Sequence, residues 1–303
     1  TERGPGGRAT MTSWLSEWLR RGELVMADVG AVAGHYTSGT IWDRLVEALV
    51  DDGVDPDSPT VTQLAPYDQF HGRGLEATEE LADSIEIATS DRILDVGSGL
   101  GGPARYLADR FGCHVDGVDL TSEFCEVAER LCALTSLDDQ VTIHHASGLD
   151  MPFEDESFDG VYSMNVSMNI ADRYGLYREI HRVLRPGGWL VLSELAQGPN
   201  TAELNFPVPW AATAEESFLT TPERTCELLE ACGFTVSECT DSTAATRDYG
   251  ARARALVEQG HKPPHRAVGL VHPEMARIAL ANSGAGTQAQ QVVPIEIHCT
   301  RNT

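Results

Sequence analysis

Apolar residues in the middle of the chain fall in short runs, which alternate with segments where they recur every three or four positions. Short apolar runs bounded by turn residues are typical of buried strands, and the wider spacing is typical of helices. The runs predict strands at 93–96, 114–119, 141–144, 160–164 and 189–193. Helices are predicted between these strands, starting at residue 104, at 123–133 and at 173–184.

The segments outside this region are predicted mainly as helices. Apolar faces at helical spacing predict helices at about 11–28, 40–50, 75–87, 222–232, 243–259 and 273–282. Two further strands are expected at 234–239 and 291–299. Residues 51–60 and 66–74 are expected to form a loop and a turn-like segment. Residues 194–218 are long and irregular, which is typical of a lid.

The first predicted strand ends in a turn that is rich in glycine. Asp95 interrupts the apolar residues just before the turn, and glycines follow at positions 97, 99, 101 and 102. Glycine allows the backbone to turn sharply and to approach a ligand closely. Pro103 fits the first turn of the next helix, where its missing N–H does no harm. A strand, a glycine turn and a helix N-terminus together predict a nucleotide-type binding corner.

Gly97, Gly99 and Gly102 match the dinucleotide-binding pattern G-x-G-x-x-G. This match alone is ambiguous, because an ordinary strand-to-helix turn can also contain glycines at this spacing. Asp119 ends the second predicted strand. Its distance along the chain from the glycine turn is close to the roughly 20 residues expected for an acid that binds ribose hydroxyls. Its two oxygens can accept hydrogen bonds from two neighbouring hydroxyls. This spacing favours a ribose-containing cofactor over a purely structural turn.

Two later motifs extend the pattern. An L-x-M-P-F-x-x-x-S-F-D run ends at Asp159, and L-R-P-G-G spans Leu184–Gly188. Together with D-x-G-x-G-x-G at Asp95–Gly101 and with Asp119, this ordered set resembles the class I S-adenosylmethionine-dependent methyltransferases. The resemblance runs from about residue 91 to residue 194.

Segments outside these motifs point to one branch of the family. Asp68–His71 and Ser167–Ile170 resemble the small-molecule branch with sarcosine/dimethylglycine-type N-methyltransferases, a branch that also holds O- and C-methylating enzymes. The resemblance implies an α/β fold with a Rossmann-like seven-stranded methyltransferase sheet. The last strand would be antiparallel, with helices on both faces, and N-terminal helices and a helical cap would complete the fold.

The resemblance also implies the cofactor, S-adenosyl-L-methionine, which leaves as S-adenosyl-L-homocysteine. The family often carries Asp where this chain has Ser147, and that Asp accepts a hydrogen bond from the adenine amino group. A serine hydroxyl can still accept one, so we expect a weaker contact, or one made by the backbone of Gly148 and Leu149. The implied cofactor-binding residues are Asp95, Gly97, Ser98, Gly99, Gly101, Asp119, Leu120, Ser147, Gly148, Leu149, Asn165 and Gln69.

Methyl transfer from a sulfonium is an in-line displacement, which requires alignment of the reacting atoms more than dedicated catalytic groups. A base is needed when the acceptor arrives protonated, and His71 is the first candidate because it lies in the branch-specific segment. The resemblance places Tyr36 over the cofactor. Asn169 is expected to orient the acceptor, and Glu194 to hold a cationic one. A structural role is an equal alternative for His71. His35, His144 and His145 are further candidate bases, for which a structural role is favoured.

Composition limits the partners. A formal net charge of −24 argues against nucleic acid and anionic membranes, both of which need basic patches. The sequence contains no run of about 20 apolar residues, so no transmembrane helix is predicted. The 7 cysteines have irregular spacing without C-x-x-C, so no metal site or disulfide framework is expected, and a reducing cytoplasm fits. We expect a small-molecule substrate, and the apolar N-terminal helices leave a homodimer open.

The expected organisation has five parts: disordered or vector-derived residues at 1–10, an N-terminal helical lid at 11–75, the cofactor-binding core at 76–196, a cap with remaining core elements at 197–290, and a final strand and tail at 291–303. The leading hypothesis is methyl transfer to nitrogen, oxygen or carbon of a small molecule. A second is a scaffold that holds the cofactor structurally and catalyses a cyclisation. A nicotinamide-dependent dehydrogenase is disfavoured by Asp95 and the L-R-P-G-G motif.

Overall fold

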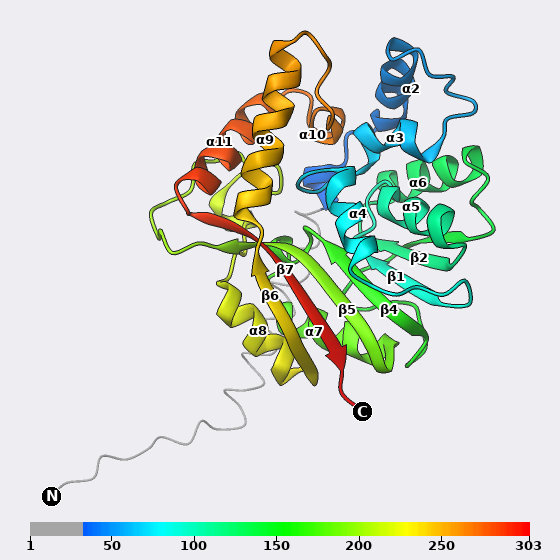
Figure 1. The fold of residues 1–303 in the computed structure, drawn as a ribbon, viewed down its shortest axis with the longest axis vertical. Coiled ribbons are helices and arrows are strands. Elements are labelled where there is room, and N and C mark those ends of the chain that lie inside the picture. Colours follow the sequence, from blue (N-terminus) through cyan, green and yellow to red (C-terminus); the bar gives the residue numbers. More distant parts are fainter. Residues whose placement is uncertain (1–32) are drawn as a thin grey trace, which may run out of the picture.

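The computed structural model describes residues 33–303, so the helix expected at 11–28 lies outside the described residues. A seven-stranded sheet in the order β3-β2-β1-β4-β5-β7-β6 forms its centre (Figure 1). β7 is antiparallel to both of its neighbours, whereas β1 to β5 are parallel. The predicted Rossmann-like sheet is confirmed. The strands are β1 (Arg92–Val96), β2 (His114–Asp119), β3 (Val141–His145), β4 (Phe158–Met164), β5 (Leu184–Gln197), β6 (Phe234–Asp241) and β7 (Val292–Arg301).

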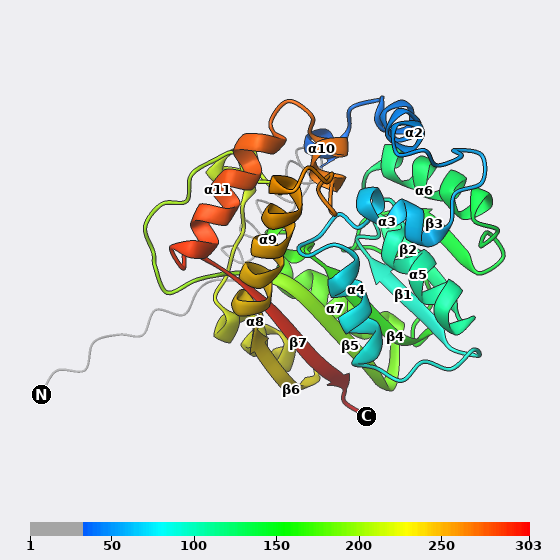
Figure 2. The same cartoon turned by 45° about the horizontal axis from the view of Figure 1, so that its top comes forward.

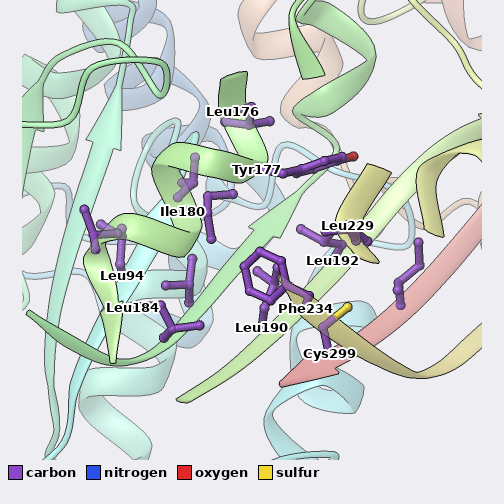
Figure 3. Packing of buried hydrophobic residues seen from close by; sticks show 14 of the residues in the cluster. Leu94, Leu176, Tyr177, Ile180, Leu184, Leu190, Leu192, Leu229, Phe234 and Cys299 are labelled. Carbon is purple, nitrogen blue, oxygen red and sulfur yellow. The ribbon is translucent and has the colours of Figure 1, made fainter. Parts of the chain in front are cut away.

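Helices cover both faces of the sheet because successive strand residues point to opposite sides. Ile93 of β1 belongs to the buried cluster formed with α4 (Leu75–Asp83), α5 (Gly102–Phe111) and α6 (Ser122–Leu134). Its neighbour Leu94 belongs to the opposite cluster, formed with α7 (Arg173–Val183) and α8 (Pro222–Ala231). Figure 3 shows this second cluster, in which Leu176 and Ile180 of α7 face Leu190 and Leu192 of β5.

The cap lies between β6 and β7 in the chain. It consists of α9 (Thr243–Glu258), α10 (Ala267–Val271) and α11 (Ala276–Gln288). These helices stand at the end of the sheet where the parallel strands terminate, alongside α2 (Ile41–Asp51) and α3 (Val61–Asp68) (Figures 1 and 2). Ligands of open α/β sheets bind at this carboxyl end, so the cap covers the region where the site is expected.

The predicted elements at 40–50, 75–87 and 243–259 correspond to helices α2, α4 and α9. Helix α3 differs from the expectation, because the sequence predicts no element at 61–65 and a turn-like segment from residue 66. It begins with a capping box in which the Thr60 and Gln63 side chains satisfy each other's backbone N–H groups. Within residues 33–303, no helix combines the length and the apolar character needed to cross a membrane.

Candidate active site

The glycine turn after β1 is fixed by backbone hydrogen bonds to the end of β2. The N–H groups of Gly97 and Ser98 donate to the Val118 carbonyl, at 2.8 and 3.1 Å. Gly97 has a φ of +79°, and a Cβ at this position would lie 2.2 Å from Val166 Cγ2. Both the backbone angle and the contact therefore require glycine, and the turn packs tightly against the segment that follows β4.

Two carboxylates flank this turn, the buried Asp95 and the half-buried Asp119. Asp119 accepts hydrogen bonds from the N–H groups of Gly99 and Thr121, both at 2.8 Å. Within the described residues, Oδ2 of Asp95 is buried and has no hydrogen-bond partner. Burial is the main cause that raises the pKa of Asp95 to about 7, and the Asp119 carboxylate also raises it. Unpaired buried acceptors are costly, so these groups fit a ligand that brings hydroxyl or ammonium donors.

A cavity of about 1110 Å³, including its open side, lies over the turn. Ser147 is in its wall, and the Ser147 hydroxyl accepts a hydrogen bond from the Leu149 N–H at 3.2 Å. The structure therefore brings together almost the whole predicted cofactor set from the ends of four strands, β1 to β4. The predicted residues that line the cavity are Asp95, Gly97, Ser98, Gly99, Asp119, Leu120, Ser147, Gly148, Leu149 and Asn165.

Gln69 and Gly101 do not line this cavity. The Gln69 side chain instead accepts a hydrogen bond from the Thr78 hydroxyl at 2.6 Å and donates to Asp68 at 3.3 Å. Gly101 has a φ of +74° at the start of α5, and a Cβ there would lie 2.9 Å from Nη1 of Arg105. The contacts of both residues are to protein groups. They therefore support the glycine turn and do not face the cavity.

Asn165 follows β4 in a left-handed conformation, with a φ of +57°. In the amide orientation that satisfies both of its polar atoms, its nitrogen donates to the Ser193 carbonyl and its oxygen accepts from the Gly72 N–H, both at 3.2 Å. This side chain therefore ties the segment after α3 to the end of β5.

Tyr36 and Asn169, which both line the cavity, bond to each other. The Tyr36 hydroxyl donates to Asn169 Oδ1 at 3.2 Å, and Asn169 Nδ2 donates to the Trp210 carbonyl at 2.6 Å. The Tyr36 ring packs against Phe70 and Phe124, with centroid distances of 5.8 and 5.6 Å. The N-terminal segment, the segment after β4 and the long segment after β5 therefore meet here.

His71 also lines the cavity, but its ring nitrogens already have protein partners. Nδ1 lies 3.2 Å from the Gly72 carbonyl oxygen, and Nε2 lies 3.2 Å from both Gln69 Oε1 and Thr78 Oγ1. Burial lowers the pKa of His71 to about 3. The imidazole is therefore neutral near pH 7 and bonded to the protein, which favours a structural role over that of a base.

The alternative histidines are also bonded to the protein. His144 Nε2 lies 2.8 Å from Asp116 Oδ1, and His145 Nε2 lies 3.0 Å from the Leu120 carbonyl. His35 Nε2 lies 3.3 Å from the Pro209 carbonyl oxygen. These contacts fit the structural interpretation of all three side chains.

A second chamber, of about 2080 Å³ including its open side, adjoins the first. The two share four wall residues, Tyr36, Phe70, His71 and Asn165. The outer wall of the chamber belongs to α9 and α11, and no residue of α9 is buried. The wall combines small residues, among them Gly250, Ala251, Ser283 and Gly284, with larger polar and charged ones, among them Arg247, Asp248, Tyr249 and Arg254.

Glu194 lines the second chamber at the end of β5. Its side chain is 2% exposed, and its oxygens accept from the Ser167 N–H at 3.1 and 3.2 Å. Burial raises the pKa of Glu194, and Arg173 only partly opposes this effect. Among the described residues Glu194 makes no salt bridge within 4.0 Å. The sequence signal for this site was an acid placed directly after an apolar strand.

Comparisons with known proteins agree with this geometry. Residues 94–192 match the family model described as a methyltransferase domain. The chain is 31% identical over 225 residues to the O-methyltransferase resE of Aspergillus sclerotiorum, covering 71% of this chain and 78% of the relative. It is 32% identical over 129 residues to the glycine/sarcosine/dimethylglycine N-methyltransferase of Actinopolyspora halophila, covering 43% and 23%. The solved [4+2]-cyclase SpnF shares the fold, with a TM-score of 0.60, 21% identity, and coverage of 81% of this chain and 98% of that one.

The sheet order, the glycine turn and the two acids define a Rossmann-like protein that binds a ribose-containing cofactor. The relatives narrow this class. The chain belongs to the class I S-adenosylmethionine-dependent methyltransferases, in the family of small-molecule methyltransferases. The family and cofactor predictions are confirmed, and the nicotinamide alternative is set aside.

Proposed function

We propose that this protein methylates a hydroxyl oxygen on a bulky small-molecule acceptor, such as a natural-product intermediate. One observation carries the proposal: the cofactor cavity and the larger chamber share the walls formed by Tyr36, Phe70, His71 and Asn165. An acceptor in the chamber would thus reach the cofactor without crossing solvent. The chamber is larger than the cofactor cavity, which favours a bulky acceptor.

The residues at the junction suit an in-line displacement. S-adenosylmethionine, when bound, supplies an activated methyl group. The rings of Tyr36 and Phe70 exclude water from the junction, and Asp95 and Asp119 would hold the cofactor through its hydroxyl and ammonium donors. Glu194 is the acid placed to accept the proton of an acceptor hydroxyl, because its raised pKa makes it a better base than an exposed carboxylate.

A relative matched over 71% of this chain supports oxygen as the methylated atom, because resE is named an O-methyltransferase. The N-methyltransferase relative matches less than half of the chain. The cap helices α9 to α11 would then contact the part of the acceptor that differs between the substrates of different enzymes in this family.

The test is an incubation of the purified protein with S-adenosylmethionine and a panel of bulky phenols, macrolactones, amines and enols. S-adenosylhomocysteine release and product mass are measured together. We expect hydroxyl-bearing acceptors to gain one CH₂ unit with matching release of S-adenosylhomocysteine. N-methylated or C-methylated products alone would refute the choice of oxygen. A product of unchanged mass with intact S-adenosylmethionine would instead identify the cyclisation alternative.

A further inference from the structure

The segment between Tyr36 and α2 is held by one carboxylate of the core. Oε2 of Glu123 accepts hydrogen bonds from the N–H groups of Ser38 and Gly39, at 2.6 and 2.7 Å. Oε1 accepts from the Ile41 N–H at 2.9 Å. More than 80 residues separate Glu123 from these donors. The carboxylate therefore fixes a distant chain segment at the point where Tyr36 leads into α2.

Glu123 occupies the first turn of α6, next to the wall of the cofactor cavity. Leu120, Thr121 and Phe124 line that cavity on either side of it. Phe124 also packs against the Tyr36 ring, with centroids 5.6 Å apart. One helix start therefore contacts the cofactor cavity with one set of groups and the Tyr36 segment with another.

The segment has few other polar attachments. The Ser38 hydroxyl accepts a hydrogen bond from Arg44 Nη2 at 2.8 Å, which is a contact near in sequence. Arg44 in turn donates to the Leu270 carbonyl in α10, also at 2.8 Å. Ser38 and Gly39 themselves are exposed, so apolar packing does not hold them. The charge-assisted bonds to Glu123 are the stronger class of hydrogen bond.

We propose that Glu123 is a positioning residue that latches the Tyr36 segment closed over the bound S-adenosylmethionine. It acts through Tyr36, which lies between the cofactor cavity and the acceptor chamber and bonds Asn169 on the opposite side. A segment that is closed for only a fraction of the time weakens apparent cofactor affinity by that fraction. The inference relies on the proposed function only in placing S-adenosylmethionine in the first cavity, and it does not depend on which acceptor is methylated.

The test compares Glu123→Gln with Glu126→Gln. Glutamine keeps the shape of Glu123 but has one acceptor oxygen for three converging N–H groups, so at least one donor is left facing an NH₂ group. Glu126 lies one turn further along α6, is exposed, and makes no hydrogen bond within the described residues. It is therefore a matched control with the same change in charge on the same helix.

Two quantities are measured without any turnover: S-adenosylhomocysteine affinity by calorimetry, and amide hydrogen exchange of Ser38, Gly39 and Ile41. We expect Glu123→Gln to weaken binding about tenfold, which corresponds to roughly 1.4 kcal/mol, and to speed exchange at these amides. Glu126→Gln should match the unmodified protein in both. If Glu123→Gln fails to fold, the test uses Glu123→Asp, in which the side chain is shorter by one CH₂ group. This variant should show the same two effects to a smaller degree.

Unchanged affinity in a folded Glu123 variant would overturn the latch, whether or not the amides exchange faster. Equal weakening by both variants would overturn it too, because the cause would then be charge alone. Neither result bears on acceptor chemistry. Conversely, a panel that yields no methylated product would refute the proposed function and leave the latch supported if the binding difference is present.

Discussion

Replacing Arg105 by methionine should destabilise the protein severely. Nη2 of Arg105 donates to Asp68 Oδ2 and to the Leu100 carbonyl in the glycine turn, both at 2.8 Å. The Arg105 and Asp68 side chains are 0% and 1% exposed. The pair therefore links α3 to the turn that holds the cofactor, with neither charge in contact with solvent.

The size of the effect follows from this burial. Removing one partner leaves an uncompensated buried charge, which typically costs about 3–5 kcal/mol. Total stabilities are only about 5–15 kcal/mol, so the loss is a large part of the whole. In proteins of comparable size, this corresponds to a fall in melting temperature on the order of 10 °C. Losing the bond to Leu100 should also loosen the glycine turn and weaken cofactor binding.

The assay is thermal and denaturant unfolding of Arg105→Met, of Arg110→Met, and of the double variant Asp68→Leu with Arg105→Met. Arg110 lies on the same helix, and its ion pair with Asp83 is largely exposed, so its loss should cost no more than about 1 kcal/mol. The double variant should recover most of the stability, because no unpaired charge remains. An Arg105→Met protein as stable as Arg110→Met would refute the reasoning.

Three further predictions concern the site. Gly97→Ala should weaken S-adenosylhomocysteine binding at least tenfold by calorimetry, since its Cβ would meet Val166, whereas Gly99→Ala, with nothing within 4 Å of the added Cβ, should lose less. Glu194→Gln should lower kcat with little change in cofactor affinity. In the unmodified enzyme, kcat should fall as the pH drops through the raised pKa of Glu194, and a flat profile would exclude it as the base. Gly284→Phe should raise KM for bulky acceptors only, while Gly269→Phe, outside the chamber wall, should not.

The cofactor half of the site could be predicted from sequence because it depends on local backbone geometry. Glycines with positive φ, a strand-end acid and fixed spacings leave direct marks in the chain, as Gly97 and Asp119 show. Gln69 is predicted as a cofactor-binding residue from its neighbours in the sequence, whereas in the structure its side chain bonds Thr78 and Asp68. Those contacts join separate elements and leave no periodic signal.

Helix α3 was missed for a related reason. It is an 8-residue helix that contains Pro66, so it shows too few apolar repeats to reveal a helical period. Its capping box, Thr60 with Gln63, was a readable start signal that periodicity alone passed over. Glu123 carried a weaker signal still, because an acid in the first turn of a helix is ordinary, and only the fold brings Ser38 and Gly39 to it.

The residues of the acceptor half of the site contribute less to the stability of the fold than the residues of the cofactor half. No residue of α9 is buried, and a Cβ added at Gly284 of α11 would meet nothing within 4 Å. The side chains of α9 and the position of Gly284 therefore contribute little to core packing, whereas the residues around Gly97 and Arg105 cannot change without strain or an unpaired charge. Substitutions in α9 and at Gly284 should consequently alter acceptor choice at little cost in stability, so these positions are the ones at which a change of substrate is expected to be easiest.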